Sequence, residues 1–325
     1  MASTLRALRR RILTPDISET QLSKRGFHDK GPEARFLLET VGRNFLGGFA
    51  RAAESQVPDD ITAPLDAIEP QYRGFAYEGA AMAYALMDGL SLGSAQRTAR
   101  FLAGEGDKHV YMAYVGVGWA LARLPRVRWA KASAAANDPL LRWLVLDGYG
   151  FHQAYFQTAR YVHDMHEETA FPWPADDTTG YAHHAIDQGV GRALWFVAGS
   201  SATLAANLID RFPERRRQDL YSGAGLAATY AGGSDEAELR TFRDRAGEHR
   251  PWVAQASAFA AQARVRAGLV VPHTELATGV FCDMSPEEAA TLTDKAIPEH
   301  PAGDTPTYET WRATIADVFL QRGGY

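Results

Sequence analysis

Residues 146–156 read LDGYGFHQAYF and place two glycines two positions apart, among a carboxylate, a histidine and aromatic rings. The same frame recurs along the chain: a small residue, any residue, a second small residue and, usually, an alanine two positions later. Its first small residues are separated by 37, 32, 41, 34 and 33 positions. They are Gly79, Gly116, Gly148, Gly189, Gly223 and Ala256.

A period near 34 residues is typical of helix–turn–helix repeats of the tetratricopeptide kind. Glycine costs a helix about 1 kcal/mol relative to alanine, so its recurrence indicates places where helices approach closely. A longer period also appears, since Gly79 precedes Gly189 by 110 residues and Gly116 precedes Gly223 by 107. Strand signals are nearly absent. We therefore predict an all-α, tetratricopeptide-like helical-repeat array of about six helix pairs with an internal duplication.

A dinucleotide-binding loop is the main alternative for such glycines. GYGFHQ fails the GxGxxG fingerprint because position 153 is glutamine, and no strand precedes it. GAGLAA at 223–228 matches GxGxxA by letter but also lacks a preceding strand and a ribose-binding acid. Helix packing accounts for the glycines better than phosphate binding does.

The predicted organisation has three parts. Residues 1–35 form a basic helix and a linker, residues 36–285 the repeat body, and residues 286–325 a C-terminal extension. Within the body the first triplet of pairs spans about 65–160 and the second about 181–270, and a weaker copy of the frame lies around Gly42. The first helix carries Leu5, Leu8 and Ile12 among arginines. It either docks on the body or contacts anionic lipid or a membrane partner.

Composition excludes several classes of function. The 325 residues carry a net charge of −5, which does not favour a nucleic-acid partner. The single cysteine, Cys282, excludes an intramolecular disulfide and a CxxC zinc site. No apolar run approaches the length that spans a bilayer. We expect a cytoplasmic protein, associated with a membrane only through a partner.

Four residues are candidates for chemistry. Equivalent positions line one surface in a stacked array, so Glu78 and Asp147, which directly precede a first glycine, would face one groove. Arg192 is the natural counter-ion, and His152 could shuttle protons or donate a hydrogen bond. The alternatives are that the carboxylates cap or bridge neighbouring helices and that His152 is an ordinary core residue.

Aromatic side chains crowd the glycine frames and could line a slot for a flat or linear lipophilic ligand. The alternative is an ordinary hydrophobic core. Histidines in the insert at 162–180 lack the pattern of a zinc-binding helix, so we predict no metal site, and the sequence indicates no cofactor. The predicted substrate-binding residues are Tyr77, Trp119, Tyr149, Phe151, Tyr155, Gln188 and Trp195.

Several segments resemble a family of uncharacterised domains that are encoded alongside enediyne polyketide synthases in actinomycetes and other bacteria. The resemblance covers residues 25–285, and DGYGFH and GRALWF are its more specific segments. The others that carry it are RGFAYEGAAMAYALMD, YVGVGWALARL, DPLLRWLVLDGYGFHQAYF, DQGVGRALWFVAG and LYSGAGLAATYAGG.

This resemblance implies an accessory role in enediyne biosynthesis, a form of antibiotic and secondary metabolism. The protein would bind a linear, apolar polyketide polyene and assist its maturation towards the acetylenic core. Its partners would be other proteins of the enediyne cassette, a membrane protein among them. The family supplies no catalytic residues. A non-catalytic helical-repeat scaffold or carrier that assembles those partners is the alternative, because repeat arrays are commonly binding platforms.

Overall fold

The computed structural model describes residues 2–93, 96–169, 171–174, 177, 179–299 and 304–322. This part of the chain is largely helical and contains no β-strand, so the predicted all-α fold is confirmed. All six glycine frames lie inside helices. The long helices that carry them are α5 (Pro70–Leu90), α7 (Val110–Arg123), α9 (Trp143–Phe156), α10 (Ala182–Val197), α12 (Glu214–Ala231) and α14 (Arg250–Arg266).

A shorter helical segment follows each long helix, which gives the six pairs that the repeat predicts. The long and short helices alternate in the same order in the two halves of the array, as the predicted duplication requires. The short segments are α6 (Arg97–Ala103), α8 (Trp129–Ala132), a π-helix (Ala159–His163), α11 (Ala202–Ile209), α13 (Glu236–Arg245) and α15 (Pro272–Cys282). Because most are short, the long helices pack directly on one another.

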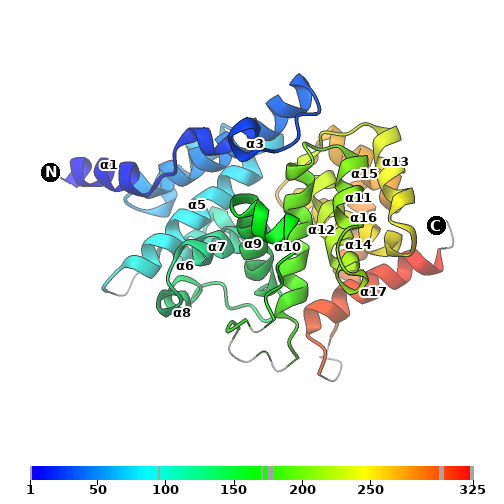
Figure 1. Ribbon diagram of the computed structural model, residues 1–325. Coiled ribbons are helices and arrows are strands. Elements are labelled where there is room, and N and C mark those ends of the chain that lie inside the picture. Colours follow the sequence, from blue (N-terminus) through cyan, green and yellow to red (C-terminus); the bar gives the residue numbers. More distant parts are fainter. Residues whose placement is uncertain are drawn as a thin grey trace.

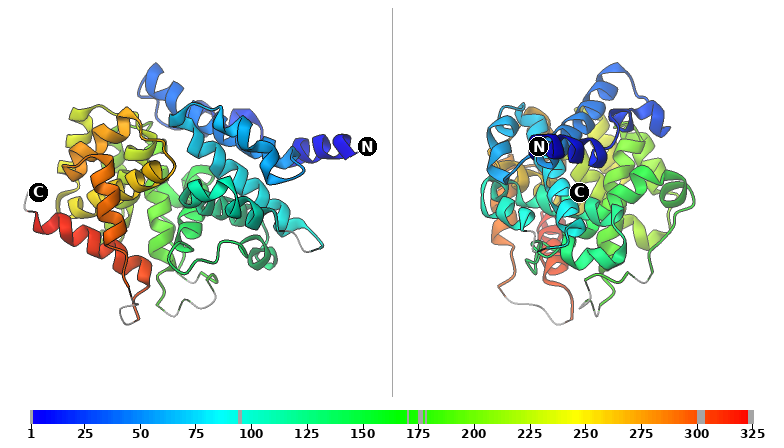
Figure 2. Two further views of the ribbon diagram at one scale, coloured as in Figure 1. Left: turned by 180° about the vertical axis from the view of Figure 1, so that it is seen from behind. Right: turned by 90° about the vertical axis from the view of Figure 1, so that its left-hand side faces the viewer.

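The remaining helices lie at the two ends of the array. Figure 1 shows α1 and α17 at opposite ends of the molecule, and the rear view in Figure 2 agrees. Helix α3 packs on α5, and α16 and α17 pack on α14. The bounds are α1 (Ala2–Leu13), α2 (Leu22–Arg25), α3 (Pro32–Glu54), α4 (Thr62–Asp66), α16 (Pro286–Lys295) and α17 (Thr307–Gln321).

The first glycine of each frame packs against the preceding long helix. A Cβ atom on Gly148 would lie 2.0 Å from the carbonyl oxygen of Val115 in α7, and one on Gly116 would lie 2.2 Å from that of Glu78 in α5. Real side chains cannot approach backbone so closely. Each contacted carbonyl belongs to the residue just before the first glycine of the preceding frame, so these glycines set the register between successive helices.

Where the second small residue of a frame is glycine, at Gly118, Gly150, Gly191 and Gly225, it packs against the following long helix. A Cβ on Gly118 would meet the carbonyl oxygen of Val145 at 1.9 Å, and one on Gly150 would meet that of Ile186 at 2.1 Å. Each frame therefore lets one helix approach both of its neighbours. This is the packing role that the sequence predicts for the small residues.

Helix α3 carries the upstream copy of the frame, at a position different from the predicted one. A Cβ on Gly48 would lie 1.9 Å from the carbonyl oxygen of Ala76, and one on Gly79 would lie 1.9 Å from that of Phe45. The in-register copy is therefore at 46–48. The predicted stretch, ETVGRNFLGGF at 39–49, therefore does carry a copy, but at 46–48 and not at Gly42, which faces the side chain of Thr20.

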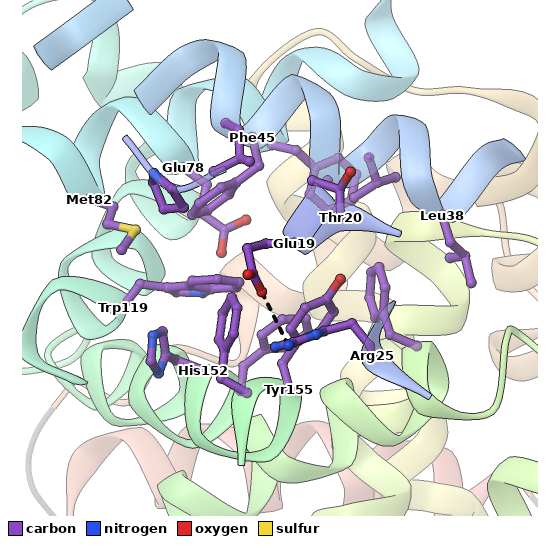
Figure 3. Close-up of a pocket in the computed structure, with 18 of the residues that line it drawn as sticks. Glu19, Thr20, Arg25, Leu38, Phe45, Glu78, Met82, Trp119, His152 and Tyr155 are labelled. Carbon is purple, nitrogen blue, oxygen red and sulfur yellow. Dashed lines mark ion pairs between the residues drawn. The ribbon is translucent and has the colours of Figure 1, made fainter. Parts of the chain in front are cut away.

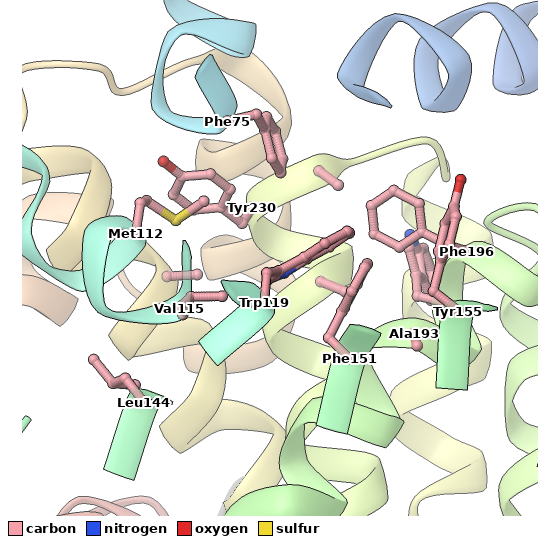
Figure 4. Packing of buried hydrophobic residues seen from close by; sticks show 14 of the residues in the cluster. Phe75, Met112, Val115, Trp119, Leu144, Phe151, Tyr155, Ala193, Phe196 and Tyr230 are labelled. Carbon is pink, nitrogen blue, oxygen red and sulfur yellow. The ribbon is translucent and has the colours of Figure 1, made fainter. Parts of the chain in front are cut away.

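The array curves until its late helices meet its early ones. The buried guanidinium of Arg264, near the end of α14, donates to the carbonyl oxygens of Pro70 and Gln71 at the start of α5, both at 3.0 Å. It also donates to the carbonyl oxygen of Tyr230 at 2.6 Å. Buried side chains of the inner helices consequently share one core, in which Figure 4 shows Phe75, Trp119 and Tyr230 among others.

Candidate functional site

A cavity of about 520 Å³ lies inside the curve of the array, between α3, α5, α7, α9 and α10. Its volume falls within the range of small-molecule sites, roughly 300–1,000 Å³. The wall is mostly aromatic and aliphatic, with a few charged groups. The lining residues with the largest apolar side chains are Leu38, Phe45, Leu46, Phe75, Met82, Trp119, Phe151, Tyr155, Phe156 and Phe196.

Trp119 is the centre of the aromatic wall. Its ring centroid lies 4.5 Å from that of Phe45, 5.1 Å from that of Phe151 and 6.3 Å from that of Tyr155. Such spacings are those of directly packed aromatic rings. The rings come from three helices, so the wall is built by the close approach of helices that the glycines allow.

A cluster of three ionisable side chains lies at the inner end of the cavity; two of them line it and the third, Asp147, lies behind its wall. Glu78, Asp147 and Arg192 are 2%, 3% and 6% exposed, and come from α5, α9 and α10. Arg192 donates a hydrogen bond through Nη1 to Oδ1 of Asp147 and lies with Nη2 3.9 Å from Oε1 of Glu78. The guanidinium also packs over the ring of Phe151. One cation therefore serves two carboxyl groups, and Asp147 holds it more closely.

Glu78 is the member of the cluster left without a full charge partner. Its Oε1 is buried and has no hydrogen-bond partner within the described residues. Burial raises the pKa of Glu78 to about 8, and Arg192 and the nearby Trp119 only partly oppose that rise. Figure 3 shows the Glu78 carboxyl pointing toward Trp119. A protonated carboxyl group at neutral pH is thus available inside an apolar cavity.

His152 lines the same cavity beside Trp119 and Phe156. Burial lowers its pKa to about 4, so the imidazole is neutral at pH 7. Its Nδ1 lies 3.4 Å from Oε1 of Gln153. The ring can exchange a hydrogen bond with a ligand, but it does not contact Glu78 or Asp147 through any hydrogen bond that the structure shows.

The N-terminal segment covers the mouth of the cavity. Residues 15–25 contribute Pro15, Glu19, Thr20 and Arg25 to the lining. Nη2 of Arg25 forms an ion pair with Oε2 of Glu19 at 3.2 Å, which Figure 3 marks, and its guanidinium lies over the ring of Phe156. The sequence predicts only a linker here. Ordered contacts with distant helices make this segment part of the wall.

The structure brings six of the predicted site residues to this cavity. Five further candidates lie elsewhere or behind it. The six that line the cavity are Glu78, His152, Arg192, Trp119, Phe151 and Tyr155.

Asp147 lies behind the cavity wall, where it binds Arg192 and borders a smaller cavity of about 40 Å³. Tyr77 stacks on His109 and donates to Asp66, on another side of α5. Tyr149 packs against Trp129 and Phe171.

The last two candidates belong to the second half of the array. Gln188 donates to Oδ1 of Asp219 at 2.9 Å, in a buried polar network that also binds Arg312 of α17. Trp195 packs on Phe242 and donates to the carbonyl oxygen of Gly232 at 3.0 Å. Both side chains are fully engaged away from the cavity.

Several of the lining residues, predicted or not, follow a simple spacing within the frames. Met82, Trp119, Phe151 and Arg192 each lie three positions after the first glycine of their frame, and all four line the cavity. Tyr155 and Phe196 each lie seven positions after it. These positions fall on one helix face. Comparing residues at the same number of positions after the first glycine of each frame would have identified Met82 and Phe196 as lining residues. The same comparison would have excluded Tyr149 and Trp195.

Other features of the described residues are peripheral to this cavity. The three metal-capable side chains that gather within 4.8 Å of one another there, Glu214, Glu248 and His249, are half-buried or exposed at the surface. In the same part of the chain no helix is both long and apolar enough to cross a bilayer.

The comparisons with known proteins identify a family. A family model described as "Protein of unknown function (DUF1702)" matches residues 4–319. Since this match spans nearly the whole chain, the protein belongs to the DUF1702 family. No curated protein and no solved structure matches the chain.

Proposed function

We propose that this member of the DUF1702 family binds a linear polyene intermediate of enediyne biosynthesis and assists its maturation towards the acetylenic core. The proposal that the protein binds a polyene rests on the aromatic cavity, which has the buried Glu78 carboxyl at its inner end. The pathway rests on the resemblance of segments such as DGYGFH and GRALWF to proteins encoded with enediyne polyketide synthases.

The cavity suits such a ligand in three respects. Its wall is elongated across several helices and is mainly apolar, so a hydrocarbon chain loses contact with water on binding. Flat rings such as Trp119 and Phe151 can pack on conjugated double bonds. The polar groups at the wall are few, which is typical of sites that orient a largely apolar ligand.

Three residues of the cavity wall would act on the bound ligand, namely Glu78, Arg192 and His152. Asp147 would position Arg192. A neutral Glu78 can donate a proton or hydrogen bond to the ligand, and a neutral His152 can accept or donate one. Asp147 keeps Arg192 at the end of the cavity and withholds it from Glu78.

Binding is tested by filling the cavity. Leu46→Trp places a large ring where a buried leucine lines the cavity, and Leu92→Trp makes the same change at a site that is 96% exposed. We expect the first variant to lose affinity for a linear conjugated polyene about tenfold or more, and the second to bind like the wild type. Equal affinity in all three proteins, measured by fluorescence titration, would contradict the proposed site.

Participation in the pathway is tested by co-expression with an enediyne polyketide synthase. We expect the profile of polyene products to change when the gene is present, and the change to be lost with Leu46→Trp and with His152→Ala. Circular dichroism would verify that both variants are folded. An unchanged product profile with and without the gene would overturn the assignment to this pathway.

A non-catalytic scaffold is the second candidate, and α1 is the feature that favours it. Leu5, Leu8 and Ile12 are 66%, 50% and 70% exposed and share one helix face beside arginines. Such a face can dock on a partner. Replacing all three by serine would abolish product formation in the host while leaving polyene binding intact if scaffolding is the main role. A normal product profile would exclude it.

A further inference from the structure

The inner end of the cavity holds two buried polar atoms that lack hydrogen-bond partners among the described residues. Oε1 of Glu78 and Nε1 of Trp119 are each shielded from solvent, and neither makes a hydrogen bond to another described residue. Both residues line the cavity, and the Trp119 indole lies close enough to donate to an ionised Glu78 carboxylate, which is one of the influences that lower the pKa of Glu78. Figure 3 shows the carboxyl directed toward the indole. Two polar groups without hydrogen bonds thus lie close together in a mainly apolar cavity, with Arg192 as the charged neighbour of Glu78.

Both groups are hydrogen-bond donors at neutral pH. The indole N–H can only donate. Glu78 donates when it holds its proton, which burial and the closer pairing of Arg192 with Asp147 favour. A buried donor left unsatisfied costs about 1–3 kcal/mol. A pure hydrocarbon would leave both donors unsatisfied.

A carbonyl oxygen would satisfy both donors at once, since it has two lone pairs in the plane of its substituents. Building on the ligand cavity proposed above, we infer that the ligand is a conjugated carbonyl compound. It is a linear polyene aldehyde or ketone, whose oxygen accepts hydrogen bonds from the Glu78 carboxyl and the Trp119 indole. The polyene chain then lies against the rings of Phe45 and Phe151.

This arrangement also has a chemical consequence. Two donors on one carbonyl oxygen withdraw electron density from the conjugated chain, as preorganised donors do in enzymes that stabilise developing negative charge. The same polarisation moves the absorption maximum of a bound polyene carbonyl to longer wavelength. The absorption spectrum therefore reports the hydrogen bonds separately from binding itself.

The test compares two probes, a linear conjugated tetraenal and the tetraene hydrocarbon of equal chain length. The wild type should bind the tetraenal about tenfold or more tightly than the hydrocarbon, as the cost of unsatisfied donors requires. The absorption maximum of the bound tetraenal should shift to the red. Glu78→Met and Trp119→Phe should each reduce this preference and the red shift. Because both side chains line the cavity, the readout is the ratio of the two affinities in each variant and not the affinity for the hydrocarbon alone.

Glu78→Gln is the matched control, because its amide donates a hydrogen bond at every pH. It should keep the preference for the tetraenal across the whole range, whereas the wild type should lose it above about pH 8. Equal affinities for the two probes in the wild type, or an unchanged preference in Glu78→Met, would overturn the carbonyl inference alone. Failure of both probes to bind would overturn the polyene cavity as well.

Discussion

At the scale of single residues, Glu78 contributes a pH dependence to the stability of the protein. Its folded pKa of about 8 lies above the value of about 4.5 expected in the unfolded chain. The folded state therefore holds a proton that the unfolded chain releases between these values. The contribution of Glu78 to stability is fully present below about pH 4.5 and is lost as the pH rises to about 8.

We predict that Glu78→Gln flattens this dependence. Relative to the wild type, the variant should gain stability as the pH rises from 5 to 8, by up to about 1.4 kcal/mol per pH unit. Urea denaturation of both proteins at several pH values measures the difference and cancels the titration of all other groups. A difference that stays constant over this window would show that Glu78 is ionised in the folded protein.

The sequence located part of the site at this scale. The position before the first glycine predicts that Glu78 faces a groove, with Arg192 as counter-ion, and both side chains line the cavity. Gln188 occupies the same position in α10 but faces a different polar network, because α17 packs there and supplies Arg312. Contacts with a distant helix cannot be deduced from a local frame.

At the scale of helices, the glycines fix how closely neighbours approach. Gly148→Ala would place its methyl group 2.0 Å from the carbonyl oxygen of Val115, which only a shift of the backbone can relieve. We predict a loss of at least about 3 kcal/mol in the free energy of unfolding, at or beyond the usual range for overpacking.

Gly279→Ala is the control for this prediction. Gly279 also lies inside a helix, α15, but has nothing within 4 Å of the added methyl group. We expect stabilisation by about 0.5–1 kcal/mol, because alanine favours the helix. Chemical denaturation of both variants makes the comparison, and similar effects at the two positions would contradict the packing role of the frame.

Helices were the best-predicted level of structure. Small residues at fixed offsets inside a periodic pattern specify helix contacts locally, so all six frames were located from the sequence. The frame in α3 was misplaced, because two further glycines, Gly42 and Gly47, lie close to it and only the register with α5 distinguishes Gly48. The cover formed by residues 15–25 has no periodicity and could not be predicted.

At the scale of the whole molecule, Arg264 joins the late helices to the early ones. Its three carbonyl acceptors lie on α5 and α12, far from α14 in sequence. We predict that Arg264→Met costs about 3 kcal/mol or more, since the three hydrogen bonds that its buried guanidinium donates are lost together. The aromatic cavity should also become more accessible to a fluorescent apolar dye.

Arg266→Met provides the matched control. Arg266 lies two residues further along α14 and donates to Asp107 at the surface, so its loss should cost less than about 1 kcal/mol. Thermal unfolding and dye binding of the two variants make the comparison. If both arginines contribute equally, the closure of the array does not depend on Arg264.

A crystal structure of the protein with a bound linear polyene aldehyde tests the central claim most directly, namely that the cavity inside the curved array is the ligand site. We expect the chain to lie against Phe45, Trp119 and Phe151, with its oxygen within hydrogen-bonding distance of Glu78. A ligand bound only at the outer surface, with the cavity occupied by solvent or closed by side chains, would contradict the claim.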